Sequence, residues 1–72
     1  MDVQAQMAGT VFRILVEAGQ TVKAGEDVVI LESMKMEIPH STPVGGIVRE
    51  IYVQEGDFID EGQKLVRIEA QP

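Results

Sequence analysis

The sequence predicts an all-β fold, a sandwich or flattened barrel in which two similar halves cover each other's apolar faces. The composition is 44% hydrophobic and rich in valine and isoleucine, residues that favour strands over helices. An internal repeat and recurring glycines predict two halves of similar structure. A chain of 72 residues buries a modest share of its surface. We therefore expect one compact domain over residues 1–72.

The internal repeat is the most informative feature of the chain. A shift of 37 positions aligns residues 7–33 with residues 44–70, and eight of the 27 aligned pairs are identical. The identical pairs are glycines, apolar residues and one acid: Gly9/Gly46, Val11/Val48, Ile14/Ile51, Val16/Val53, Gly19/Gly56, Gly25/Gly62, Val29/Val66 and Glu32/Glu69. Chance would not favour glycines and apolar positions in this way. Residues 34–43 then form the segment that links the two halves.

Each half is expected to contain two strands separated by a glycine-bounded turn region. The first half has strands over 11–16 and 28–32 around a turn region over 19–25, and the second has strands over 47–53 and 65–69 around a turn region over 56–62. Glycine adopts positive φ without steric cost, which explains its recurrence at both turns. Two copies are too few for a solenoid, so a closed pseudo-twofold arrangement with few exposed sheet edges is the better solution.

The segment over residues 32–37 is the one place where the local pattern leaves helix and strand open. Its residues have good helix propensity, but they lie between a strand-like run and Pro39. An antiparallel reversal within residues 34–43 would keep both halves in one domain.

The charge and composition exclude several classes of protein. Twelve acids against six bases give a net charge of −6, which argues against nucleic-acid binding. Partner proteins with basic or mixed surfaces are expected instead, although acidity that serves solubility alone is an equal alternative. The chain has no cysteine, and it shows neither a secretory leader nor about 20 consecutive apolar residues for a membrane span. We expect a cytoplasmic protein, or one of an organelle matrix after processing.

No catalytic or metal-binding constellation is evident in the sequence. The single histidine, His40, follows Pro39 and is expected to be an ordinary loop residue without a nucleophile to serve. The acidic residues Asp57, Asp60 and Glu61 lack the spacing of a calcium loop and are expected to form a solvated turn. We therefore expect no catalytic residue, no metal and no enzyme activity.

Lys35 is the residue that carries a chemical hypothesis. It is one of three lysines and the only one in the linking segment, whereas Lys23 and Lys64 lie in or beside the repeat turns as surface charges. Met34 and Met36 flank it, and two flexible apolar side chains are unusual on an exposed turn. The alternative is that both methionines belong to the core and Lys35 simply points outward.

The run Glu32 to Glu37, Glu-Ser-Met-Lys-Met-Glu, resembles the attachment signature of biotinyl domains, whose centre is Met-Lys-Met or Met-Lys-Leu. The chain resembles the biotinyl/lipoyl attachment domain family over its whole length, above all the short stand-alone biotin/lipoyl attachment proteins. A carrier domain cut from a larger carboxylase is the alternative. The resemblance also rests on positions where that family places turns and strands: Gly9-Thr10-Val11, Val16 to Gly19, Val22, Gly25, Gly45 to Val48, Glu55 to Ile59 and Gly62.

The resemblance implies a flattened barrel or sandwich of two four-stranded antiparallel sheets, with Lys35 at the tip of a tight hairpin and the termini near the opposite end. A two-residue turn prefers Asn-Gly or Gly-X because it needs positive φ, and Met34-Lys35 offers neither. We therefore predict positive φ at non-glycine residues in this turn. Disfavoured backbone of this kind tends to occur at functional sites, and a helix through residues 32–37 would contradict the prediction.

The resemblance further implies a biotin carboxyl carrier. Biotin would be attached covalently to Lys35 by biotin protein ligase, and the carrier would move a carboxyl group between a biotin carboxylase and a carboxyltransferase. Only about one lysine amine in a thousand is neutral at pH 7, so the ligase must supply the activation. Met34 and Met36 are implied as recognition residues, and Glu32 more weakly, since its repeat partner Glu69 allows a structural role. We expect a monomeric domain.

Two other functions stay open at this point. A lipoyl carrier domain of a 2-oxoacid dehydrogenase complex would have the same fold and carry lipoate on Lys35, but it typically has Asp-Lys-Ala around its lysine. An unmodified adaptor domain, such as those in efflux assemblies, is a non-carrier alternative, and a lysine at the hairpin argues against it.

Overall fold

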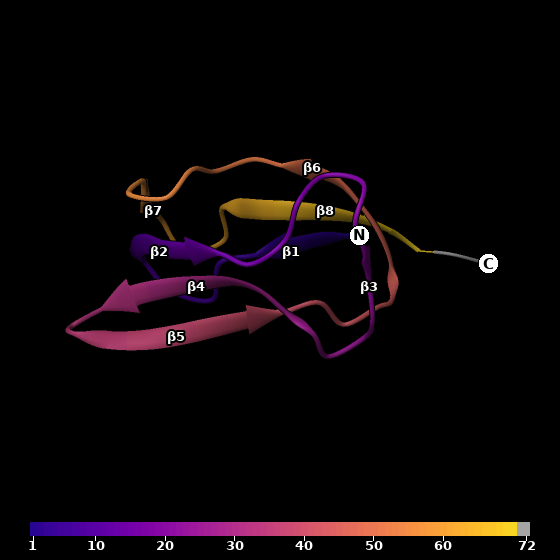
Figure 1. The fold of residues 1–72 in the computed structure, drawn as a ribbon. Helices are drawn as coiled ribbons and strands as arrows, with labels where there is room; N and C mark the ends of the chain where they lie inside the picture. The colour runs from indigo at the N-terminus through magenta and orange to yellow at the C-terminus, as the bar shows by residue number, and fades with distance from the viewer. Residues whose placement is uncertain (71–72) are drawn as a thin grey trace.

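A computed structural model describes residues 1–70, which fold into eight β-strands in two antiparallel sheets of four strands each (Figure 1). The strands are β1 (Asp2–Gln4), β2 (Gly9–Ile14), β3 (Thr21–Val22), β4 (Asp27–Ser33), β5 (Met36–Ser41), β6 (Gly46–Ile51), β7 (Phe58–Ile59) and β8 (Lys64–Ala70). The two sheets are separate in this part of the chain, so the fold is a flattened sandwich and not a closed barrel. The described residues include no helix that could span a membrane.

The strands repeat with the spacing of the sequence repeat. Moving β2, β3 and β4 forward by 37 residues gives the bounds of β6, β7 and β8, and moving β1 gives residues 39–41 of β5. The sheet orders are β1-β8-β6-β3 and β5-β4-β2-β7. Each half therefore places one strand at each edge of the sheet that the other half builds. This exchange produces the predicted pseudo-twofold fold.

The turn glycines adopt the backbone conformation that the repeat predicts. Gly19 and Gly56 have φ of 91° and 96°, and Gly25 and Gly62 have φ of 87° and 86°. The amide of Gly19 donates to the carbonyl of Val48 at 2.7 Å, and in the other half the amide of Gly56 donates to the carbonyl of Val11 at 2.8 Å. The same bond thus ties each turn to the sheet of the opposite half.

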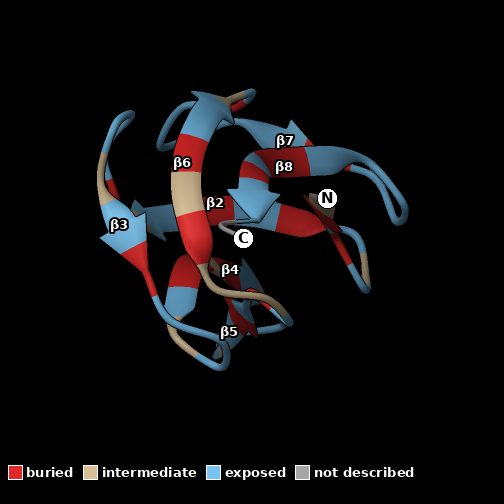
Figure 2. Cartoon of the chain, turned by 90° about the vertical axis from the view of Figure 1, so that its right-hand side faces the viewer, coloured by how far each residue is buried: buried red, intermediate tan, exposed pale blue. Residues whose placement is uncertain are grey.

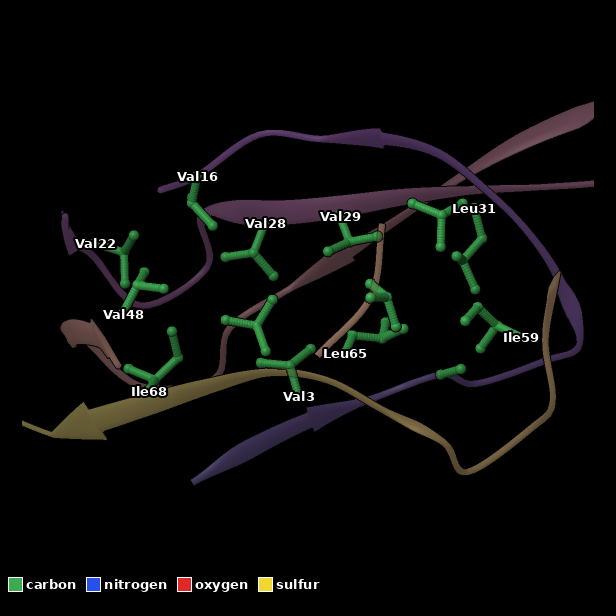
Figure 3. Close-up of a cluster of buried hydrophobic side chains, with 14 residues drawn as sticks. Val3, Val16, Val22, Val28, Val29, Leu31, Val48, Ile59, Leu65 and Ile68 are labelled. Atoms are coloured by element: carbon green, nitrogen blue, oxygen red, sulfur yellow. The ribbon is translucent and has the colours of Figure 1, made fainter. Parts of the chain in front are cut away.

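The core lies between the two sheets and consists of aliphatic side chains from both halves (Figure 3). Along β2, β6 and β8, buried residues are interspersed with exposed or half-buried ones, as expected for strands with one face in the interior (Figure 2). Each fully buried aliphatic side chain stabilises the fold by about 1.5–3 kcal/mol through the hydrophobic effect. The buried core residues are Val3, Ala5, Val11, Val16, Val22, Val28, Val29, Leu31, Val48, Val53, Ile59, Leu65, Val66 and Ile68.

Two further glycines allow neighbouring strands to approach closely. A Cβ atom at Gly9 would lie 2.8 Å from the carbonyl oxygen of Glu32, and one at Gly46 would lie 2.1 Å from that of Glu69. Only glycine fits at such distances. Gly9 thereby sets how β2 packs beside the outer end of β4, where the hairpin between β4 and β5 leaves the sandwich.

The expectation that His40 is a loop residue is wrong. His40 lies in β5 and its side chain is only 2% exposed. Its Nε2 accepts a hydrogen bond from the backbone amide of Gln6 at 3.0 Å, so its Nδ1 carries the proton and donates to the carbonyl of Ile38 at 3.2 Å. The imidazole is a satisfied polar group inside the fold.

Candidate functional site

The hairpin that joins β4 to β5 projects from one end of the molecule, while the start of β1 and the end of β8 lie toward the other (Figure 1). Glu32 pairs with Glu37 and Ser33 pairs with Met36, which leaves Met34 and Lys35 as a two-residue turn. The hairpin therefore presents Lys35 at its tip.

The backbone of this turn has the predicted unusual conformation. Met34 and Lys35 have φ of 53° and 63°, and they are the only non-glycine residues with positive φ in the described range 1–70. Positive φ at both central residues is the requirement of a type I′ turn, which normally takes Asn-Gly. The prediction of positive φ is confirmed, and the helical alternative for residues 32–37 is excluded. The sheet imposes the conformation against local preference.

The side chains of the turn are exposed to solvent. Met34 is 91% exposed and Met36 is 64% exposed, so neither methionine belongs to the core. Lys35 between them is also exposed. The alternative in which the methionines pack inside is therefore wrong. Two apolar side chains in water forgo the free energy of burial, which fits a surface that a partner covers.

Lys35 makes no ion pair with any side chain in the described part of the chain. Within residues 1–70 the ion pairs are Arg49 with Glu69 and Lys64 with Asp2, and neither involves Lys35, Glu32 or Glu37. No described side chain holds the ammonium of Lys35 in place. The primary amine is accessible to a large reagent, which is what covalent attachment of an acyl group requires.

Glu32 and its repeat partner Glu69 have different surroundings. The Nε atom of Arg49 lies 2.5 Å from Oε2 of Glu69, and this hydrogen bond, followed by the arginine charge, lowers the pKa of Glu69 below its ordinary value. The residue that corresponds to Arg49 in the first half is Phe12. The structural role of the acid at Glu69 therefore has no counterpart at Glu32, a distinction that the repeat alone did not reveal.

The hairpin is not part of any pocket or metal-binding cluster in the described residues. Residues 1–70 form no pocket, and they contain no group of three or more His, Asp or Glu side chains placed to hold a metal ion. The acidic turn contributes to structure, since Oδ2 of Asp57 accepts the backbone amide of Gln54 at 2.8 Å, and Asp60 and Glu61 are exposed. The hairpin presents an exposed primary amine at its tip.

Sequence reasoning missed one candidate near the hairpin. Phe58 in β7 is 68% exposed and pairs with Thr10, which in turn pairs with Glu32 of β4. The repeat could have drawn attention to Phe58, because the corresponding position in the other half holds a threonine, Thr21.

Comparison with known proteins identifies the family. The biotin/lipoyl family model, described as "Biotin-requiring enzyme", matches residues 1–68. The chain is 47% identical over 68 residues to the biotin/lipoyl attachment protein of Bacillus subtilis (strain 168), covering 94% of this chain and 93% of that protein. It is 42% identical over 65 residues to the pyruvate carboxylase of Staphylococcus aureus (strain Mu50 / ATCC 700699), covering 90% of this chain but 6% of the carboxylase.

Solved structures agree with this assignment. The urea carboxylase of Kluyveromyces lactis superposes with a TM-score of 0.91 at 26% identity, covering 96% of this chain and 6% of that one. A single-chain, multi-domain long-chain acyl-CoA carboxylase superposes with a TM-score of 0.86 at 30% identity, covering 92% of this chain and 7% of that one. The chain therefore belongs to the biotin/lipoyl attachment family, as a biotin-attachment domain homologous to the biotin carrier domains of carboxylases.

Proposed function

We propose that the protein is a biotin carboxyl carrier, whose Lys35 receives biotin through an amide bond and then moves a carboxyl group between two enzyme active sites. The observation that supports this most directly is the position of Lys35 in an exposed two-residue turn between Met34 and Met36. Its relatives include the biotin carboxyl carrier protein of Streptococcus mutans serotype c (strain ATCC 700610 / UA159).

The attachment step needs a partner enzyme. The amine of Lys35 attacks the acyl carbon of a biotinyl adenylate made by biotin protein ligase, an amide bond forms, AMP leaves, and the amine loses a proton. An ordinary lysine is almost entirely protonated at neutral pH, so the ligase must remove that proton. The carrier itself is not an enzyme in this proposal.

The contribution of the carrier after attachment is geometric. Bound biotin supplies a ureido nitrogen that accepts a carboxyl group in a biotin carboxylase and releases it in a carboxyltransferase. The lysine side chain and the biotin chain together reach on the order of 10–15 Å beyond the tip. Tethering replaces diffusion of free biotin with a high effective concentration at each active site. The projecting hairpin lets the rest of the domain stay outside the partner's active site.

Glu32, Met34 and Met36 are proposed as residues that biotin protein ligase recognises. All three are exposed at or beside the turn, and no ion pair within residues 1–70 engages Glu32. Exposed apolar side chains beside an acceptor residue can be buried by an incoming protein, which supplies binding free energy.

Lipoate on Lys35 is the alternative cofactor. The Bacillus subtilis relative is called a biotin/lipoyl attachment protein, and both attachments need the same exposed amine. The methionines on either side of Lys35 favour biotin.

Co-expression with biotin protein ligase tests the proposal. We expect the intact mass to increase by one biotinyl group, and peptide mapping to place it on Lys35. Lys35→Arg should abolish capture by avidin, whereas Lys64→Arg, the matched control, should be captured like the wild type. Biotin on Lys23 or Lys64, or on the Lys35→Arg variant, would contradict the assignment. Transfer is then tested by adding a biotin carboxylase and a carboxyltransferase to the biotinylated carrier.

A further inference from the structure

Both phenylalanines of the chain lie on the outer face of the β5-β4-β2-β7 sheet, beside the hairpin. Phe58 pairs with Thr10, Thr10 pairs with Glu32, and Glu32 pairs with Glu37, so these four residues form one row across the sheet. All four side chains are exposed, and Phe12, two residues beyond Thr10 on β2, is exposed as well. The exposed fractions are 68% for Phe58 and 43% for Phe12.

The fold itself does not need either phenylalanine. The position that corresponds to Phe58 in the other half holds Thr21, which pairs with β6 in the same way. The position that corresponds to Phe12 holds Arg49, next to a register shift in β6 that matches the one in β2. The same strands thus form with threonine and arginine. Two exposed aromatic rings forgo the free energy of burial, and the repeat offers no structural reason for them.

The charges on this face restrict what can cover it. Glu32 and Glu37 make no ion pair within residues 1–70, and the guanidinium of Arg13 lies 6.0 Å from the Phe12 ring centroid. The chain as a whole has a net charge of −6. An apolar pocket with a basic rim is the surface that complements an exposed phenylalanine beside two free carboxylates.

We propose that this aromatic face, made of Phe12, Thr10, Phe58, Glu32 and Glu37, is the docking surface for the ligase that acylates Lys35, with Phe58 as its main apolar contact. The inference rests on the proposed function. Glu32 and Glu37 lie three residues before and two residues after Lys35, so a protein that encloses the tip covers the row to which Phe58 belongs. A contact this far from the reacting amine is equal in the bound complex and the transition state, so it lowers KM and leaves kcat unchanged.

The test is steady-state biotinylation of the purified unmodified protein by biotin protein ligase. Phe58→Thr installs the residue of the corresponding position in the other half, so the sheet should persist, and a melting curve checks this. We expect KM for the carrier to rise about tenfold, as for loss of a central aromatic contact, with kcat within about twofold of the wild type. Phe12→Arg is a second variant from the same comparison, and its KM should also rise.

Leu15→Thr is the matched control, because Leu15 is 40% exposed and lies beyond the end of β2, outside the row. Its KM should equal that of the wild type. Wild-type KM in Phe58→Thr would overturn the docking surface while leaving biotinylation of Lys35 intact. Failure of the ligase to modify the wild-type protein at all would instead contradict the proposed function. Wild-type self-association that Phe58→Thr abolishes without changing KM would assign the face to a second copy and overturn the proposal.

Discussion

His40 and the backbone amide of Gln6 form a partly buried hydrogen bond of 3.0 Å between residues 34 positions apart, and the other half of the fold has no such bond. The residues that correspond to His40 and Gln6 are Val3 and Pro43. Proline has no amide hydrogen, so the second half needs no acceptor at this point. His40 thus supplies an acceptor where the first half has a donor to satisfy.

This hydrogen bond predicts the outcome of a double-mutant cycle on the free energy of unfolding. His40→Val should lower the free energy of unfolding by about 1 kcal/mol, because it leaves the partly buried amide of Gln6 without its acceptor. Gln6→Pro removes that donor, so the double variant should recover most of the loss. Urea denaturation of the wild type, both single variants and the double variant measures the coupling.

Gln6→Ala is the control for this cycle, since it changes the side chain and keeps the amide. It should not rescue His40→Val. A double variant with Gln6→Pro that is less stable than His40→Val alone would show that the hydrogen bond is not the reason for a histidine in β5.

The glycine turns should determine stability more than the hairpin lysine does. A Cβ at Gly56 would meet no atom within 4 Å, but φ there is 96°, so Gly56→Val should cost about 1–2 kcal/mol through backbone strain alone. Lys35→Ala should change stability by less than about 0.5 kcal/mol, because the side chain is exposed and makes no ion pair within residues 1–70. Thermal unfolding compares the two variants, and equal melting temperatures would contradict the role assigned to positive φ.

Exchanging the flanking methionines should change which ligase acts on Lys35. Because Met34 and Met36 are exposed, Met34→Asp with Met36→Ala leaves no cavity, and the double variant should keep its melting temperature. Biotinylation should slow and lipoylation should improve, since specificity is a difference between affinities for two ligases. The measurement is the rate of modification by purified biotin ligase and lipoyl ligase, side by side. An unchanged biotinylation rate would remove the methionines from the recognised surface.

The Arg49–Glu69 pair predicts a small acid dependence of stability. The pKa of Glu69 is lowered from 4.5, first by the hydrogen bond from Arg49 and then by its charge. A lowered folded-state pKa stabilises the fold above the unfolded value, and this stabilisation is lost as pH falls through the folded value. Arg49→Gln should therefore lower the melting temperature slightly at neutral pH and have no effect in strong acid. Because the pair is exposed, added salt should reduce the effect. An effect of Arg49→Gln that persists in strong acid would mean that packing, not charge, is responsible.

The sequence predicted the features that local chemistry decides. Glycine permits the positive φ that a tight turn needs, so its recurrence at Gly19 and Gly56 indicated both turns. The family resemblance located the hairpin at Lys35. The sequence did not reveal the burial of His40, because the amide that donates a hydrogen bond to the imidazole is 34 residues away. The sequence left undecided whether Met34 is exposed, because an apolar side chain is not the residue expected on an exposed, strained turn. The domain bounds and the cytoplasmic location remain predictions.

The exchange of edge strands has a consequence for the order of events during synthesis. β8 lies between β1 and β6 and is the last of the described strands to be made. Until its residues leave the ribosome, β1 has no partner strand, and the first-made half lacks the β7 edge of its own sheet. Because β1 and β6 both pair with β8, their sheet cannot be complete before β8 is made. The hairpin, although made at mid-length, therefore acquires its rigid support only after translation has passed it, so an enzyme that reads the folded tip must act on the finished domain.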